Sequence, residues 1–333
     1  MAMTSFLSRF GRGTVLGGAA VCAVVIGLLL WWLLPLGSAQ PRGTVVFSTG
    51  VRSGVYEKYG ELLKHAVDRD LPRVRMELRA SEGSQENVAR VATGKADFTI
   101  AAADAVEKYR EDGGEGAESL RGCARLYDDY LQLVVAESSG IHKVADLRGK
   151  RVAVGQVGSG VRLIADRLLT KAGLDPEHDI TPVGIGIDTM NEQLKRGKID
   201  AFFWSGGLPT VSVRELSETF PVRFVPLGDL VDAVRHAGGE GRFYRTAVMP
   251  RDAYPAAHND GTVMTLAVAN LLVTRDSLDP DLTEGVTRTV IASRDGIGQQ
   301  VHAAQKVDLR TAIYTDPLEL HEGAQQYYRS VKP

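Results

Sequence analysis

The sequence of 333 residues is poor in cysteine, having only Cys22 and Cys123. Cys22 lies inside an apolar N-terminal run, follows Ala-Ala-Val and has no polar residue after it, a context that argues against lipid attachment. Cys123 is then the one cysteine of the remaining chain, so no intrachain disulfide stabilises the fold. We expect Cys123 to be buried as a small apolar side chain.

The chain also lacks a strong charge of either sign and the usual signatures of enzymes. Its formal charge is −2, and no basic patch indicates a nucleic-acid partner. The seven histidines are scattered without a His-x-x-x-His pair, and no Gly-x-Ser-x-Gly elbow occurs. The glycines of residues 155–160 are in the wrong order for a dinucleotide-binding loop. We predict no catalytic residues, no cofactor and no metal site.

The longest stretch without charge lies at the N-terminus. No charged residue occurs between Arg12 and Arg42, and residues 15–36 are apolar apart from glycines, which is long enough to cross a bilayer. The basic residues before this run keep the N-terminus in the cytoplasm. We predict a cytoplasmic segment 1–13, a signal anchor or signal peptide 14–36 and a linker 37–43. Retention of the anchor and cleavage after Ala39 both place the rest outside the cytoplasmic membrane.

One pattern is present twice. The first copy has an apolar strand at 44–47, Ser53-Gly54-Val55 opening a helix, and Gly94-Lys95-Ala96-Asp97 before an apolar strand. The second has a strand at 151–154, Ser159-Gly160-Val161 and Gly197-Lys198-Ile199-Asp200. Two similar α/β units indicate two lobes that face a shared cleft.

Strands alternate with helices in both copies, which favours an α/β fold with parallel-type sheets. Further strands are predicted at 73–78, 98–102, 131–136, 181–187, 201–204, 222–227 and 263–273, and helices follow residues 55, 87, 161, 190 and 230. Since the first unit alone has too few strands, we expect the chain to return to it. Lobe 1 would comprise 44–137 with 245–333, lobe 2 would comprise 138–244, and hinges would lie near 137 and 245.

The two Ser-Gly helix starts are the leading candidates for ligand binding. In open α/β sheets, ligands lie beyond the carboxyl ends of the strands, where helix N-termini favour an anion. Ser53, Gly54 and Val55 occupy this position in one copy, and Ser159 and Gly160 in the other. Either serine could instead only cap its helix. Capping does not require the same tripeptide at matched positions of both copies. The repeat of Ser-Gly-Val therefore favours ligand binding over capping alone.

Other polar and aromatic residues could complete such a site. Ser84 and Asn87 open a further helix, where capping is the alternative. Asp104 follows a buried strand and could accept a hydrogen bond from a ligand amine or cap a helix. Tyr56 is a further candidate at the first turn of a helix. Trp204 and Ser205 are two more, at the end of an apolar strand. The indole of Trp204 either forms a wall of the cleft or belongs to the core.

At these residues the sequence resembles the TAXI family of solute-binding subunits from tripartite TRAP transporters. The similarity runs in order over about residues 44–330 and is carried by these stretches: Ser48-Thr49-Gly50, Ser53 to Tyr56, Glu82 to Asn87, Gly94 to Asp97, Asp104, Leu126-Tyr127, Ala145 to Gly155, Gly158 to Gly160, Gly197 to Phe203, Gly206 to Pro209, His321 and Tyr327-Tyr328.

The resemblance implies a two-lobe periplasmic-binding-protein-like fold of type II with two hinge crossings. It also implies a cleft for a small carboxylate-bearing solute, such as glutamate or an organic acid, and delivery to a TRAP-type permease. An anchored form would suit a different role, a membrane-tethered sensor for a histidine kinase. The residues carried over by the resemblance are Gly54, Val55, Tyr56, Ser84, Asn87, Asp104, Ser159, Gly160 and Ser205.

The chain departs from the family pattern in two places. The first loop reads Val51-Arg52-Ser53-Gly54-Val55-Tyr56 where the family usually has a Gly-Gly-Thr-Tyr-like loop. A Gln-Ser-Asp-like segment is Ala102-Ala103-Asp104, which loses a side-chain donor. The first loop is therefore where we expect ligand preference to have changed.

Overall fold

A computed structural model of the chain describes residues 25 and 41–331. The chain divides into two units, residues 1–40 and 41–333, and the elements below belong to the second. Apart from Val25, the predicted segments 1–13 and 14–36 and the cleavage site at Ala39 lie outside the described residues. Of the helices in the described part, none has the length and apolar character needed to cross a bilayer.

The second unit is an α/β structure. Its strands are β1 (Gly43–Ser48), β2 (Val74–Arg79), β3 (Phe98–Ala102), β4 (Leu120–Ala136), β5 (Arg151–Ala153), β6 (Thr181–Val183), β7 (Ala201–Gly206), β8 (Val222–Val225), β9 (Arg245–Met249) and β10 (Val263–Arg275). Its α-helices are α2 (Val55–Asp70), α3 (Ser84–Ala92), α4 (Ala103–Glu111), α5 (Gly160–Lys171), α6 (Ile187–Lys195), α7 (Val211–Thr219), α8 (Gly228–Arg235), α9 (Pro280–Ala292), α10 (Arg294–Gly298) and α11 (Glu322–Val331).

The strands are hydrogen-bonded in the order β2-β1-β3-β10-β4-β7-β5-β6, with β8 also on β4 and β9 also on β10. The pairs of β1 with β2 and β3, and of β5 with β6 and β7, are parallel, as the alternation of strands and helices predicts. The strands β4 and β10 run antiparallel to their neighbours. The parallel-type pairing predicted for each copy is thus found within both copies, and the two long strands add antiparallel pairs to it.

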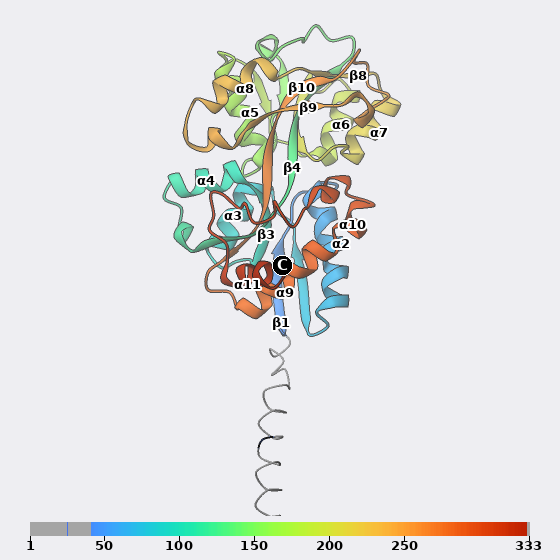
Figure 1. The fold of residues 1–333 in the computed structure, drawn as a ribbon. Helices are drawn as coiled ribbons and strands as arrows, with labels where there is room; N and C mark the ends of the chain where they lie inside the picture. The colour runs from blue at the N-terminus through green and yellow to red at the C-terminus, as the bar shows by residue number, and fades with distance from the viewer. Residues whose placement is uncertain (1–24, 26–40, 332–333) are drawn as a thin grey trace, which may run out of the picture. The chain divides into compact units, whose positions relative to one another are not determined.

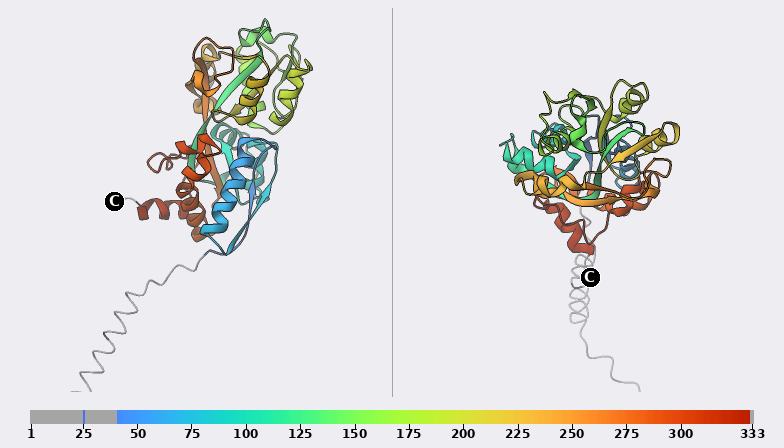
Figure 2. Two further views of the ribbon diagram at one scale, coloured as in Figure 1. Left: turned by 90° about the vertical axis from the view of Figure 1, so that its right-hand side faces the viewer. Right: turned by 90° about the horizontal axis from the view of Figure 1, so that it is seen from above.

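Two groups of elements lie one above the other in Figure 1. The lower group, here called lobe 1, holds β1, β3, α2 to α4 and α9 to α11, and the upper group, lobe 2, holds α5 to α8, β8 and β9. The long strands β4 and β10 run through both groups, and Figure 2 shows β4, in green, passing from one to the other. The chain thus starts in lobe 1, builds lobe 2 and ends in lobe 1.

The position of β9 bears on the predicted hinges. Residues 263–267 of β10 pair with β9, while residues 270–273 pair with β3. In β4, residues 120–130 pair with β10 and residues 130–135 pair with β7. Both strands therefore change partners in their interiors, near Tyr130 and near Ala267. The limits 44–137 with 245–333 and 138–244 stay a prediction.

The repeated Gly-Lys-x-Asp pattern has the same structural role in both copies. Gly94 and Gly197 have φ values of +72° and +61°, the left-handed conformation that ends α3 and α6. Asp97 Oδ2 accepts a hydrogen bond from Val46 N, and Asp200 Oδ2 accepts one from Arg151 N, each at 2.8 Å. The aspartates thus fix the strand that follows each helix to the first strand of the same copy.

Other local predictions had mixed outcomes. Gly173 has a φ of +77° and ends α5 in the left-handed conformation, as predicted. Cys123 is fully buried in the core of lobe 1, which confirms its prediction as a small apolar side chain. The strand predicted at 181–187 stops at Val183, because the chain turns into the start of α6. The strand predicted at 131–136 is the second half of β4, whose first half contains the polar residues that the periodicity missed.

Candidate functional site

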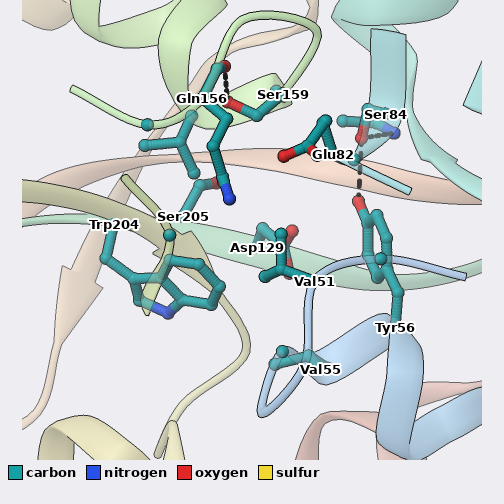
Figure 3. A pocket seen from close by; sticks show the side chains of 18 of the residues that line it. Val51, Val55, Tyr56, Glu82, Ser84, Asp129, Gln156, Ser159, Trp204 and Ser205 are labelled. Carbon is teal, nitrogen blue, oxygen red and sulfur yellow. Dashed lines mark hydrogen bonds between the residues drawn. The ribbon is translucent and has the colours of Figure 1, made fainter. Parts of the chain in front are cut away.

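A cavity of about 60 Å³ lies between the two lobes. Figure 3 shows the side chains that surround it, with Asp129 between Trp204 on one side and Tyr56 on the other. The residues that line the cavity are Gly50, Val51, Gly54, Val55, Tyr56, Glu82, Gly83, Ser84, Ala102, Asp104, Asp129, Gly155, Gln156, Ser159, Gly160, Val161, Ile164, Ile185, Gly186, Met190, Trp204, Ser205 and Val268.

The N-termini of four helices meet at this cavity. The first residues of α2, α3 and α5 and the cap residue of α6, Gly186, all belong to its lining. Within the described residues, the N–H groups of Gly160 and Val161 have no hydrogen-bond acceptor. Free N–H groups and the positive ends of helix dipoles favour a negatively charged group.

The start of α3 in lobe 1 faces the start of α5 in lobe 2. Glu86 N donates to Gly158 O at 3.0 Å, and Gln85 Nε2 donates to Ser159 O at 2.7 Å. A Cβ atom added at Gly83 would lie 3.3 Å from Ser159 Cα. The lobes therefore touch directly at this point, and both sides of the contact line the cavity.

This contact corrects the prediction that Ser53 and Ser159 oppose each other. Ser159 caps α5, since its Oγ accepts a hydrogen bond from Arg162 N at 3.1 Å, and it also lines the cavity. Ser53 is exposed, has a φ of 61° and lines a separate surface groove beside α2 and α7. The cap residue of α2 is Gly54, without a side-chain hydrogen bond. In lobe 1 the serine that faces Ser159 is Ser84.

Ser84 and Tyr56 form a buried hydrogen-bonded chain at the cavity wall. Ser84 Oγ accepts from Ala102 N at 3.1 Å and lies 3.1 Å from the Tyr56 hydroxyl, which donates to Asn270 Oδ1. Ser84 does not cap α3, because Gly83 occupies the cap position. The chain holds the phenol ring of Tyr56 against the ligand side of the sheet. Burial raises the pKa of Tyr56 well above its usual value, so the hydroxyl keeps its proton.

Asn87 lies behind the cavity and is not among its lining residues. Its side chain is fully buried and accepts from the hydroxyls of Ser48 and Ser81. It also donates to the carbonyl oxygens of Thr49 and Ile100. Asn87 thus joins the end of β1 with the residues after it, the loop at Ser81 and strand β3, and supports the site from behind. The structure does not place it where it would touch a ligand.

Two of the cavity's carboxyl groups are deeply buried. Asp104 is 1% exposed and accepts from the Tyr244 hydroxyl at 2.6 Å and from Ala105 N at 2.9 Å. Burial raises the pKa of Asp104, against the lowering effect of the Tyr244 hydroxyl. Asp129 is 4% exposed, and burial raises its pKa to about 7. Glu82 is an exposed third carboxyl group, and no Lys or Arg is found among the described residues that line the cavity.

Trp204 and Ser205 come from the end of β7. Trp204 is 6% exposed and its Nε1 donates to Thr210 Oγ1 at 3.0 Å, so its indole N–H is already bonded. Its ring both belongs to the core of lobe 2 and lines the cavity, which unites the two alternatives drawn from the sequence. Ser205 is half-buried beside it. Gly54, Val55 and Gly160 also line the cavity as predicted, although contact of any of these residues with a ligand stays a prediction.

A comparison with protein families identifies the group to which the chain is related. The sequence profile of the NMT1-like family matches residues 47–331. The chain belongs to the NMT1-like family. This match covers both lobes and every residue that lines the cavity.

Solved structures share the fold of this NMT1-like chain at low identity. An ancestral arginine-binding protein bound to arginine has a TM-score of 0.50 at 15% identity and covers 78% of this chain and 98% of its own. A protein from Bordetella bronchiseptica RB50 has a TM-score of 0.50 at 18% identity, covering 88% and 90%. The SsuA alkanesulfonate-binding protein of Xanthomonas axonopodis pv. citri bound to MOPS has a TM-score of 0.49 at 15% identity, covering 89% and 86%. The predicted α/β fold of the periplasmic-binding-protein kind is thus confirmed.

Several lining residues of the NMT1-like cavity escaped the sequence analysis. Asp129 is the main one, and its signal was present, since Asp128 and Asp129 are adjacent acids between two apolar stretches. Gln156 lies in the loop of residues 155–160, whose glycines do not fit a dinucleotide-binding loop, and the sequence carries no further signal for it. The apolar walls Ile164, Ile185 and Met190 carry no signal that separates them from core residues. They face the cavity only because of how lobe 2 is placed on lobe 1.

The arrangement is suited to holding a molecule. Among the described residues, no three His, Cys, Asp or Glu side chains come together as metal ligands would. The cavity contains neither histidine nor cysteine within the part of the chain that the structure describes. What it does offer is a set of hydrogen-bond donors at helix N-termini, buried carboxyl groups, and apolar and aromatic walls.

Proposed function

We propose that this NMT1-like protein binds a small solute between its two lobes and releases it unchanged. The observation that carries the proposal is the convergence of four helix N-termini on a cavity between the lobes. Such a site binds the anionic group of a ligand without a basic side chain. The direct contact between α3 and α5 indicates how the lobes close around the ligand.

The ligand is a small carboxylate-bearing solute, with amino acids such as glutamate and organic acids as the candidate classes. A carboxylate fits the free N–H groups of Gly160 and Val161, and Trp204 and Tyr56 provide walls for the rest of the molecule. The ancestral arginine-binding protein binds an amino acid on the same fold, which supports this class by analogy.

We place the protein on the outer side of the cytoplasmic membrane, held by residues 14–36 or secreted after cleavage near Ala39. The resemblance to the TAXI family makes a TRAP-type permease the partner that receives the solute. The apolar run of residues 15–36 favours the second candidate, a tethered sensor for a histidine kinase, because a retained anchor suits a module that signals in place. The mass of the mature chain shows whether the anchor is retained. The neighbouring genes show whether a permease or a kinase is the partner.

The lobes rotate about β4 and β10, and we place the two hinge crossings at about residues 130 and 268, where these strands exchange partners. Residues 245–267 then move with lobe 2. Two continuous strands can bend as a hinge without breaking their hydrogen bonds, whereas a crossing at 245 would separate β9 from β10. This revises the limits expected from strand counting.

Isothermal titration calorimetry with the purified chain tests the function. The panel comprises the twenty amino acids, short monocarboxylates and dicarboxylates. Heat of binding from at least one carboxylate-bearing compound is expected, with the compound recovered unchanged afterwards. Heat from none of them would overturn the carboxylate class, and chemical conversion of the bound compound would overturn binding as the whole function.

A further inference from the structure

Asp129 is a buried acid of the cavity wall, and no described Lys or Arg side chain lines the cavity to balance its charge. It lies on β4, is 4% exposed and lines the cavity, and its Oδ1 atom has no hydrogen-bond partner within the described residues. The preceding residue, Asp128, points its carboxylate at the guanidinium groups of Arg125 and Arg245. Neighbouring positions on one strand thus carry one neutralised acid and one acid without a counter-charge.

The surroundings of Asp129 make its ionised form still less favourable. Asp128 and Asp104 have the same sign as Asp129 and act on it by charge repulsion, and no described Lys or Arg side chain lines the cavity. A buried carboxylate is stable only when it is paired or fully hydrogen-bonded, and it otherwise takes up a proton. Asp129 therefore either takes up a proton or pairs with a positive group that enters the cavity.

We propose that Asp129 binds a protonated amine on the solute. This inference rests on the proposed function and narrows its ligand class. The carboxylate of the solute lies at the N-termini of α3 and α5, and its ammonium group lies at Asp129. The solute is therefore an amino acid and not a simple organic acid. Charge-assisted hydrogen bonds of this kind are the strong ones in a buried site.

The amine subsite makes binding depend on pH. The groups that face Asp129 are Asp104 from α4, Tyr56 from α2, and Asp128 and Tyr127 from its own strand, together with the uncharged Asn270 from β10. Because burial and the neighbouring acids raise the pKa of Asp129 to about 7, the free site is partly protonated near neutral pH. An arriving ammonium group then displaces a proton, so affinity rises as the pH increases from 6 to 8.

The test compares amino acids with analogues that lack the amine. L-glutamate is paired with glutarate, L-alanine with propionate and L-leucine with 4-methylpentanoate, and each is titrated calorimetrically into the full chain. The variants are Asp129→Asn, which keeps the shape and removes the charge, and Asp128→Asn as a matched control on the same strand. Thermal unfolding of each variant shows that it is folded. Titration in buffers of different ionisation enthalpy measures the protons released.

The expected result is an amino acid that binds on the order of 100-fold more tightly than its partner without the amine. Asp129→Asn removes most of that difference and abolishes proton release at pH 6, whereas Asp128→Asn keeps the preference for the amine because Asp129 retains its charge. Equal affinity of both partners, or an Asp129→Asn variant that retains the preference, would overturn the proposal.

A third arm separates this inference from the proposed function. If no carboxylate binds, putrescine and spermidine are titrated in the same way. Heat from these amines that is lost in Asp129→Asn supports the amine subsite and overturns the carboxylate class. Absence of heat from every carboxylate, amino acid and amine overturns both proposals.

Discussion

Gly160 is the position where one methyl group would interfere with closure of the lobes. It is the first residue of α5 and its φ is not positive, so other residues are compatible with its backbone. A Cβ atom added there would lie 3.2 Å from Ser84 Oγ and 3.3 Å from Ser84 Cβ. Ser84 belongs to lobe 1 and Gly160 to lobe 2. Gly160→Val therefore introduces a Cβ atom whose close neighbours both belong to the opposite lobe.

The size of the effect follows from the space available. Excess atoms in a well-packed contact cost about 1–3 kcal/mol. The lobes can avoid this cost by staying slightly apart, so the cost is subtracted from the free energy of closing on the ligand. With about 1.4 kcal/mol for each factor of ten, the dissociation constant should rise about 5- to 150-fold. The free energy of unfolding should change little, because the core of neither lobe is touched.

The assay combines calorimetry, using the amino acid that gives the largest heat, with thermal unfolding of the ligand-free chain. Gly296→Val is the matched control, since a Cβ atom at Gly296 would have no neighbour within 4 Å. This control should bind normally. An unchanged dissociation constant for Gly160→Val would refute the reasoning. A clear drop in its melting temperature would also refute it, because the contact would then belong to the packing of the ligand-free fold.

Three further predictions concern stability, measured by urea unfolding of the ligand-free chain. Asn87→Ala removes four buried hydrogen bonds and should lower the free energy of unfolding by roughly 3–4 kcal/mol. Asn191→Ala loses one hydrogen bond and should lower it by about 1 kcal/mol, and equal losses for the two variants would contradict this reasoning. Hydrogen bonds from Arg151 lower the pKa of Asp200, so its contribution is present above about pH 4 and is lost as the pH falls through its folded value. The advantage of the wild type over Asp200→Asn should therefore shrink between pH 6 and pH 3, and a constant difference would exclude this linkage. For Asp129 the dependence of stability on pH has the opposite direction. Its raised pKa of about 7 makes the free energy of unfolding fall by up to about 4 kcal/mol as the pH rises from about 4 to 7. Asp129→Asn should remove this dependence on pH.

Much of the candidate site could be predicted from the sequence because helix starts after strands have local signals. Gly54, Tyr56, Ser84, Ser159 and Gly160 all line the cavity, as their positions at helix N-termini indicated. The sequence could not rank them by role. A serine beside a glycine at a helix start looks the same whether it faces a ligand, caps the helix or lies in solvent.

Ser53 and Asp129 show why the rest could not be predicted. The Ser-Gly-Val repeat made Ser53 the counterpart of Ser159, yet a left-handed backbone turns Ser53 out to solvent. Asp129 lies within a long strand that the periodicity recognised only in part. Whether an acid in such a strand meets an arginine, as Asp128 does, or a cavity depends on segments distant in the sequence.

The amino-acid sequence is enough to predict the α/β class, the alternation of strands and helices, the duplicated unit and the burial of Cys123. These features follow from hydrophobic periodicity, glycine and the short-range chemistry of helix ends, which act over a few residues. Three features emerge from the folded arrangement alone: β4 and β10 run through both lobes, Ser84 and not Ser53 lies beside the start of α5, and no described Lys or Arg lines the cavity beside Asp129. Those features depend on contacts between residues far apart in the chain, such as Gln85 with Ser159, and local patterns carry no information about which distant surfaces meet.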